Sequence, residues 1–323
     1  MYPDLKESIL LFLINFALSF ALFPFYIRWQ NKRKVGQKIK KEGPELHLHK
    51  ENTPSGGGVI IALTTALVFS FFSGTSNHPF LIPVLLGTLG FFGIGLIDDL
   101  LKIFRNRPWG IKARNKLFFQ LLFSILIMVL GREIFPPQIN LPFSEKQLIL
   151  APWSFFFYGV FLLIATTNAF NITDGLDGLA GGCGLLTMLF WSSFFLLKNM
   201  PHYAGLCFAI SGSLMAFLYF NAWPAKIFMG DSGSLFIGAI MAVMALLSGQ
   251  SLLIIFSGII YIVDTLSVII QVFYFKLFRK RVFLMSPIHH HFELKGLKES
   301  AITTRFWVIQ CLGCLLALYG MGR

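Results

Sequence analysis

Long uncharged runs alternate with short polar segments along the whole chain. A membrane-spanning helix needs about 20 mostly apolar residues. By this measure the pattern predicts about ten transmembrane helices, at residues 8–27, 58–73, 80–97, 116–131, 152–169, 179–197, 202–221, 234–248, 250–275 and 304–322. We therefore expect an all-α polytopic membrane protein that forms a single integral-membrane domain over residues 1–323.

The composition agrees with this pattern and excludes a water-soluble protein. Hydrophobic residues make up 55% of the chain and charged residues only 13%, whereas charged residues are about 25% of a typical soluble domain. The first apolar run carries Asn15 and Pro24 and is not followed by a small-residue cleavage pattern. It is interpreted as a retained span and not as a cleaved signal peptide.

The placement of basic residues predicts the orientation. The segments that follow the odd-numbered spans contain 22 of the 27 Lys and Arg residues. Because cytoplasmic loops carry the Lys and Arg excess, these segments are expected in the cytoplasm and both termini outside. The net charge of +12 suits anionic lipid headgroups and a phosphorylated substrate, and it requires no nucleic acid.

Acidic residues gather at the predicted cytoplasmic ends of the spans. Five of the fifteen lie there, in three different loops: Asp98, Asp99, Asp174, Asp177 and Asp231. Charges near the membrane core are costly and usually mark function. A site at the cytoplasmic face is therefore expected, with pairing to loop lysines that merely fixes topology as the alternative.

The segment 166–182, TTNAFNITDGLDGLAGG, combines glycines with two aspartates before an apolar run. Glycines allow close approach of a ligand to the backbone, and a helix N-terminus favours phosphate. Asp174 and Asp177 would repel a bare phosphate, however. A divalent cation between carboxylate and phosphate resolves this conflict, and Mg²⁺ commonly binds in this way.

Two further segments leave alternatives open. In Gly-Asp-Ser-Gly at 230–233, Asp231 either caps the following helix or binds a metal. In SPIHHHFELKG at 286–296, the three histidines suit phosphate chemistry or proton movement. Zinc is the rival ligand, although adjacent side chains splay apart and no cysteine is near. In the predicted ninth span, Asp264, Ser267 and Gln271 share one face, where they either line a groove or bond to neighbouring helices.

These segments together resemble the polyprenyl-phosphate N-acetylhexosamine-1-phosphate transferases. The matching pieces include GPELHLHKENTPSGGG at 43–58, LIDDLLK, GIKARNKLFFQ at 110–120, NAFNITDGLDGLAGG, FNAWPAKIFMGDSGS, SVIIQVFYF at 267–275 and the histidine segment. The resemblance covers nearly the whole chain, and the triple histidine favours the muramoyl branch. Leu46 replaces a usual Ser, and Asp264 stands where the family tends to have Glu.

The resemblance implies a reaction. Undecaprenyl phosphate attacks UDP-N-acetylmuramoyl-pentapeptide, releasing UMP and forming lipid I, the first lipid-linked peptidoglycan intermediate. Direct attack and a covalent aspartyl intermediate both remain open. The alternative is a transferase that uses UDP-N-acetylglucosamine, and a membrane transporter is a distant third possibility. A multi-pass homodimer in the bacterial plasma membrane is expected.

The resemblance also implies residue roles. Asp231 is the expected Mg²⁺ ligand, and Asp98 is expected to accept a proton from the lipid phosphate or to hold that phosphate with Asp99. His289 is expected to contact phosphate or to support these aspartates. The expected substrate-binding residues are Lys50, Thr53, Lys102, Lys116, Asn171, Asp174, Gly175, Leu176, Asp177, Asn221, Phe228, Gln271, His290 and His291.

Overall fold

The computed structural model describes residues 5–33, 50, 53–72, 81–104 and 110–321. Part of the predicted motif at 43–58 therefore lies outside the described residues. The helices are α1 (Leu5–Lys32), α2 (Gly58–Phe72), α3 (Leu81–Phe104), α4 (Ala113–Leu130), α5 (Pro152–Thr173), α6 (Leu179–Leu197), α7 (Pro201–Asn221), α8 (Gly230–Leu247), α9 (Ile254–Ser257), α10 (Ile259–Phe278), α11 (Ile288–Leu294) and α12 (Glu299–Gly320). A 3₁₀ turn at Ser251–Leu253 precedes α9, and a small hairpin joins α4 to α5.

The predicted all-α polytopic membrane architecture is confirmed. Within the described part of the chain, eight helices are long and apolar enough to cross a membrane, namely α1, α4, α5, α6, α7, α8, α10 and α12. Helix α2 is a shorter apolar helix, and α3 is an apolar helix of 24 residues. Large apolar side chains such as Phe25, Phe161 and Tyr319 are exposed on the outside of the bundle, as expected for surfaces that face lipid.

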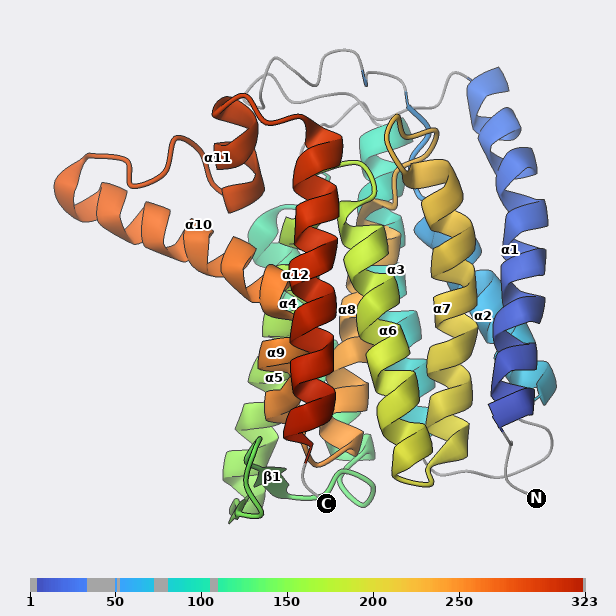
Figure 1. Ribbon diagram of the computed structural model, residues 1–323, viewed down its shortest axis with the longest axis vertical. Coiled ribbons are helices and arrows are strands. Elements are labelled where there is room, and N and C mark those ends of the chain that lie inside the picture. Colours follow the sequence, from blue (N-terminus) through green and yellow to red (C-terminus); the bar gives the residue numbers. More distant parts are fainter. Residues whose placement is uncertain (1–4, 34–49, 51–52, 73–80, 105–109, 322–323) are drawn as a thin grey trace.

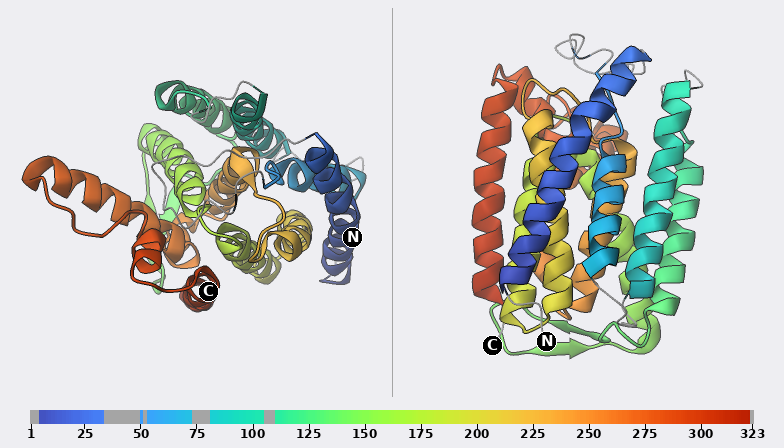
Figure 2. Two further views of the ribbon diagram at one scale, coloured as in Figure 1. Left: turned by 90° about the horizontal axis from the view of Figure 1, so that it is seen from above. Right: turned by 90° about the vertical axis from the view of Figure 1, so that its right-hand side faces the viewer.

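Helix α8 forms the centre of the bundle. All but two of its residues are buried, because α3, α5 and α2 pack around it. Helices α1, α6 and α7 form a neighbouring layer (Figures 1 and 2). Small residues at the contacts allow the helix backbones to approach closely, as is usual in membrane bundles.

The two ends of the bundle differ. Helices α3, α5 and α7 end at the upper end in Figure 1, where α6, α8 and α12 begin. Helix α1 begins and α12 ends at the opposite end, which also carries the antiparallel hairpin of β1 (Gln138–Asn140) and β2 (Gln147–Ile149). In this hairpin Ile139 pairs with Leu148. Every predicted acidic site residue thus lies at the end away from the hairpin.

Two predicted boundaries differ from the structure. Helix α3 continues to Phe104, so Asp98 and Asp99 lie inside a helix and not beyond the end of a span. The predicted span 250–275 is divided, because the helix is interrupted at Gly258, between α9 and α10. After the break, α10 projects sideways from the bundle (Figure 1).

The contact between α3 and α8 brings their backbones together at Gly95. A Cβ atom at Gly95 would overlap the carbonyl oxygen of Asp231, whereas a Cβ atom at Gly93 would meet nothing within 4 Å. The two glycines share one helix but face different surroundings. The missing side chain at Gly95 therefore allows α3 to approach the start of α8, and this close approach brings Asp98 and Asp99 near Asp231.

We expect Gly95→Ala to destabilise the protein by about 1–3 kcal/mol through overpacking. The apparent melting temperature of the purified protein in detergent should fall by several degrees. Gly93→Ala is the matched control and should melt like the wild type. Equal melting temperatures for the two variants would contradict the proposed close contact.

Candidate active site at the carboxylate cluster

Three aspartates from separate segments meet at the start of α8. Asp98 and Asp99 come from α3 and Asp231 from the first turn of α8, and one carboxylate oxygen from each lies within 4.8 Å of the others. Asp98 and Asp99 are almost completely buried. The predicted convergence of acidic residues from different loops is thus present in the fold.

Asp99 caps helix α8. Its two carboxylate oxygens accept hydrogen bonds from the backbone N–H groups of Asp231 (2.9 Å) and Ser232 (3.0 Å). These are among the helix N-terminal amides that have no partner inside the helix. Gly230, with φ of +76°, lies directly against Asp99, and a Cβ atom there would overlap the carboxylate. Asp99 therefore joins α3 to α8.

Asp231 does not cap its own helix, so the capping alternative is wrong for its side chain. Its carboxylate instead accepts a hydrogen bond from Lys116 (2.6 Å) and forms an ion pair with Lys102 (3.2 Å). Asn171 donates to the same carboxylate (3.2 Å) and also to Ser234 (2.7 Å). The side chain of Asp231 therefore faces α3, α4 and α5 and remains available to a cation.

Asp98 is held from two sides. Lys102, one helical turn later, lies 2.6 Å from Oδ2, and the backbone N–H of Ile111 donates to Oδ1 at 2.6 Å. Gly110 packs so closely that a Cβ atom would overlap this carboxylate. The close pair of aspartates is thus tolerated because a lysine and backbone amides surround it.

Asp174, directly after α5, adds a fourth carboxylate near this cluster. Burial, followed by the negative charges of Asp231 and Asp99, raises the pKa of its carboxyl group to about 7. The carboxylates of Asp98, Asp99 and Asp231 thus lie together with the ammonium groups of Lys102 and Lys116. Carboxylate oxygens are hard donors of the kind that divalent cations prefer, so Asp98, Asp99 and Asp231 could hold a metal ion.

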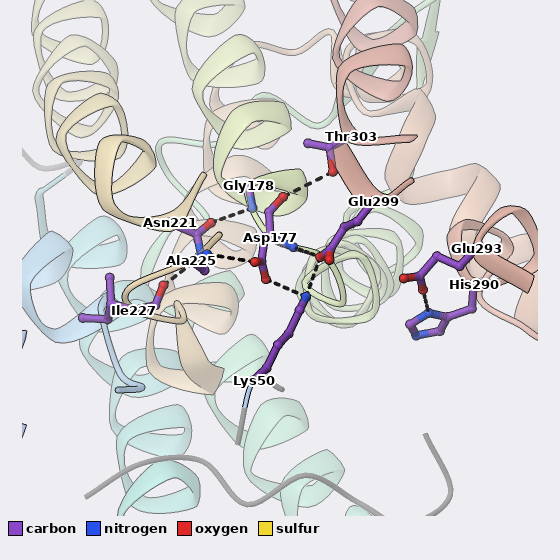
Figure 3. A network of polar contacts seen from close by, with 10 residues as sticks. All are labelled: Lys50, Asp177, Gly178, Asn221, Ala225, Ile227, His290, Glu293, Glu299 and Thr303. Atoms are coloured by element: carbon purple, nitrogen blue, oxygen red, sulfur yellow. Dashed lines mark hydrogen bonds and ion pairs between the residues drawn. The ribbon is translucent and has the colours of Figure 1, made fainter. Parts of the chain in front are cut away.

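A second network lies beside the cluster and centres on Lys50 (Figure 3). The buried ammonium group of Lys50 lies 2.7 Å from Asp177 and 2.5 Å from Glu299. Glu299 also accepts from the backbone N–H of Asp177 (2.5 Å), and Thr303 donates to the carbonyl of Asp177 (3.2 Å). The network ties the segment before α2, the loop before α6 and the start of α12 together.

Asn221 braces the same region. Its side chain accepts from the backbone N–H of Gly178 (3.0 Å) and donates to the carbonyl of Ile227 (2.9 Å). Asp177 accepts in addition from the backbone N–H of Ala225 (2.9 Å). The loop before α6 and the loop before α8 are therefore fixed to one another by side chains.

Three predicted residues flank this network through the backbone. The N–H of Thr53 donates to the carbonyl of Lys50 (3.2 Å), and that of Phe228 to the carbonyl of Pro54 (2.8 Å). Leu176 is buried between the two aspartates of its loop. The structure thus brings the segments of Lys50, Thr53 and Phe228 side by side, and their role in substrate binding stays a prediction.

His289 is fully buried and pairs with Asp264. The Nδ1 atom of His289 lies 3.0 Å from Asp264 on α10, which is also fully buried. Gly175, the neighbour of Asp174, packs against the other ring nitrogen so closely that a Cβ atom would overlap it. Asp264 therefore bonds to a residue of a neighbouring helix. The edge of the imidazole that carries Nε2 faces the loop with Asp174.

The other two histidines point elsewhere, as expected for adjacent side chains. His290 lies 2.6 Å from Glu293 within α11, and His291 accepts from the backbone N–H of Leu284 (3.1 Å). Gln271 bonds to the backbone of Val282 and Phe283. His291 and Gln271 thus fasten the segment between α10 and α11. Among the described residues, the one cluster of metal-ligand type contains no histidine.

Sequence reasoning missed Glu299. Its carboxylate holds both Lys50 and the backbone of Asp177, yet nothing local distinguishes it from an ordinary acidic residue at the start of a helix. Its function depends on segments that are 122 and 249 residues away. The only available signal was that so few acidic residues flank the last span.

Comparison with known proteins identifies the class first. Residues 81–249 match glycosyl transferase family 4. This range runs from the start of α3 past the end of α8 and includes the whole carboxylate cluster. Fold and site therefore define a polytopic membrane transferase of this class.

Full-length relatives identify the family. The phospho-N-acetylmuramoyl-pentapeptide-transferase of Thermoanaerobacter sp. (strain X514) is 40% identical over 98% of this chain and 99% of its own length. The proteins of the same name in Acetivibrio thermocellus and Bacillus cereus (strain AH187) are each 38% identical, and this chain covers 96% and 95% of their lengths. The chain belongs to the phospho-N-acetylmuramoyl-pentapeptide-transferase family, which confirms the predicted resemblance.

We expect Glu299→Ala to lower the apparent melting temperature by several degrees. The variant leaves the buried Lys50 with one carboxylate and the Asp177 amide without its acceptor, and such losses cost about 1–3 kcal/mol. Glu133→Ala, which removes an exposed ion pair with Arg132, is the control and should have little effect. A stable Glu299→Ala protein would show that the Lys50 network does not support the fold.

Proposed function

We propose that this protein transfers phospho-N-acetylmuramoyl-pentapeptide from its UDP-linked precursor to undecaprenyl phosphate, producing lipid I and UMP. The observation that carries this proposal is the cluster of Asp98, Asp99 and Asp231, formed by two helices at one end of a membrane bundle. Membership of the family supports the identity of both substrates. One substrate is a membrane lipid and the other is water-soluble, and a site at the end of the bundle is accessible to both.

The cluster is suited to bring two anions together. Phosphoryl transfer depends mainly on positioning and on neutralising charge on the phosphoryl oxygens. Lys102 and Lys116 form ion pairs with the carboxylate of Asp231. A phosphate bound beside Asp231 would be within reach of both ammonium groups. These lysines can therefore exchange a carboxylate partner for a phosphate oxygen as the substrates arrive.

Asp231, with Asp98 beside it, would hold Mg²⁺. The ion would neutralise the diphosphate and polarise the phosphorus for attack. Asp98 is placed to accept the proton of the lipid phosphate or to orient that phosphate. Asp99 gives both oxygens to the α8 backbone, so its part is to position the start of α8. His289 is fully buried between Asp264 and Gly175, so its proposed part is to support the loop that carries Asp174.

The second network supports a nucleotide subsite. The proposed nucleotide-binding residues lie in or around the loops before α6 and α8. They are Lys50, Thr53, Asn171, Asp174, Gly175, Leu176, Asp177, Asn221 and Phe228. Phe228 offers a ring for stacking on uracil. Gln271, His290 and His291 lie on the side of α10 and α11; we keep them as substrate-binding residues, with His290 near the nucleotide.

The same proposal includes the topology. Ten spans, counting α2 and α3, place both termini outside and the cluster at the cytoplasmic face of the bacterial plasma membrane. The basic residues Lys50, Lys102, Lys112, Arg114 and Lys116 lie at the cluster end, in keeping with the positive-inside rule. A homodimer is proposed from the family resemblance.

The function predicts that purified protein releases UMP from UDP-N-acetylmuramoyl-pentapeptide only when undecaprenyl phosphate and Mg²⁺ are both present. Chelation should abolish release and added Mg²⁺ should restore it, because the cluster needs a divalent cation to accept a diphosphate. UMP release and lipid I formation can be followed by chromatography. Transfer from UDP-N-acetylglucosamine in place of the muramoyl donor would refute the proposed specificity.

Asp231→Asn and Asp98→Asn should each lower the transfer rate by at least about 10³-fold. Each change removes one negative charge that the cation requires, while the amide preserves the shape of the side chain. Membrane insertion and melting behaviour should stay close to wild type, and the exposed Glu145→Gln serves as an activity control. Full Mg²⁺-dependent activity in either aspartate variant would contradict the assignment.

A further inference from the structure

Gln310 is a polar residue at the middle of a membrane-spanning helix. It lies halfway along α12 and is completely buried. Polar side chains at this depth are costly and usually have a specific partner. Gln310 lies far from the carboxylate cluster, and none of the roles described above uses it.

The partners of Gln310 lie where the ninth predicted span breaks. Helix α9 ends at Ser257, α10 begins at Ile259, and Gly258 between them has a non-helical conformation (φ −124°, ψ 24°). A break inside a bilayer removes helical hydrogen bonds, and the freed backbone groups must find other partners because water is absent.

Gln310 supplies partners on both sides of the break. Its side-chain oxygen accepts from the backbone N–H of Ile260 (3.2 Å), and its amide nitrogen donates to the carbonyl of Ser257. One planar amide thus serves the last residue of α9 and the second residue of α10. A helix break leaves a carbonyl before it and an N–H after it without helical partners, and the amide of Gln310 offers one donor and one acceptor to these two groups.

Two neighbours complete the arrangement. Thr187 on α6 donates to the carbonyl of Ser257 (2.8 Å) and lies 2.8 Å from the amide nitrogen of Gln310. Gly313, one turn after Gln310, packs so closely on the carbonyl of Phe256 that a Cβ atom would overlap it. Helices α6 and α12 therefore each contribute one hydrogen-bonding side chain to the break, and the backbone of α12 also packs closely against it.

The helix that follows the break carries residues of the candidate active site. Asp264 lies five residues after Ile259 and holds His289. Gln271 holds the segment that leads to α11. Helix α10 leaves the break sideways (Figure 1). Because Asp264 lies on α10 and His289 on α11, the direction of α10 decides whether the two side chains meet.

We propose that Gln310 is a positioning residue that fixes the break between α9 and α10 and so aims α10 at the histidine segment. Without its amide, the freed groups at Ser257 and Ile260 drive the chain towards a continuous helix or towards other angles. The structural part is independent of the reaction. The consequence for catalysis rests on the proposed function.

The structural part is tested by measuring where α10 points. Nitroxide labels are attached at Leu277→Cys on α10 and Leu197→Cys on α6, both exposed positions, in protein whose half-buried Cys311 is replaced by Ala. Pulsed electron resonance in lipid nanodiscs, without substrate, gives the distance distribution. Gln310→Met, which keeps the length of the side chain, should shift or broaden this distribution.

The matched control is Thr304→Val on the same helix. Thr304 is exposed and bonds only to the carbonyl of Ser300 in its own helix, so its removal should leave the distribution unchanged. Thr187→Val is a milder test that leaves Gln310 in place, and it should shift the distribution in the same direction as Gln310→Met. This variant keeps the proposal testable if Gln310→Met does not fold.

The catalytic part is tested by kinetics. In Gln310→Met the kcat of lipid I formation should fall roughly 10- to 100-fold, as expected when a site residue is misplaced. KM for the UDP-linked donor should change less than kcat, because the ammonium group of Lys50 pairs with Asp177 and Glu299, which lie outside α10. A fall in kcat with an unchanged distance distribution overturns the positioning role, and so does an unchanged distribution in both Gln310→Met and Thr187→Val. If wild-type protein shows no transfer, the proposed function fails, while the distance test still decides the role of Gln310.

Discussion

A carboxylate that is removed from water must be matched by hydrogen-bond donors or cations, and this constraint organises one whole end of the bundle. Asp99 is matched by two backbone amides of α8 and Asp231 by two lysines. Asp177 is matched by Lys50 and a further amide. Each match joins segments that are distant in the sequence, so the charges that prepare the site also position its helices.

The same constraint acts on the backbone deeper in the membrane. Most helices satisfy their own amides and carbonyls, but the break at Gly258 cannot. Partners then come from other helices, from Gln310 on α12 and Thr187 on α6. The protein therefore uses polar residues in its membrane interior where the chain must change direction, and α10 can leave the bundle with a defined orientation.

Local patterns predicted much of the fold, because a membrane span is a local property. Hydropathy gave the apolar helices, and the acidic residues of three loops indicated the site. Particular pairings were out of reach. The cap that Asp99 forms depends on residues 132 and 133 positions away, and Glu299 reaches Lys50 across 249 positions. Gly258 alone did not reveal the break, since glycine is common in membrane helices.

In the proposed reaction, the carboxylate cluster would couple the binding of the cation to the binding of the anionic substrate. Lys102 and Lys116 neutralise Asp231 in the structure. A divalent cation on Asp231 competes with the lysines for the carboxylate and sets their ammonium groups free to bind phosphate. A phosphate that takes up the lysines, in turn, leaves the carboxylates more exposed to a cation. Because coupling between sites is reciprocal, cation and anionic substrate would favour each other's binding.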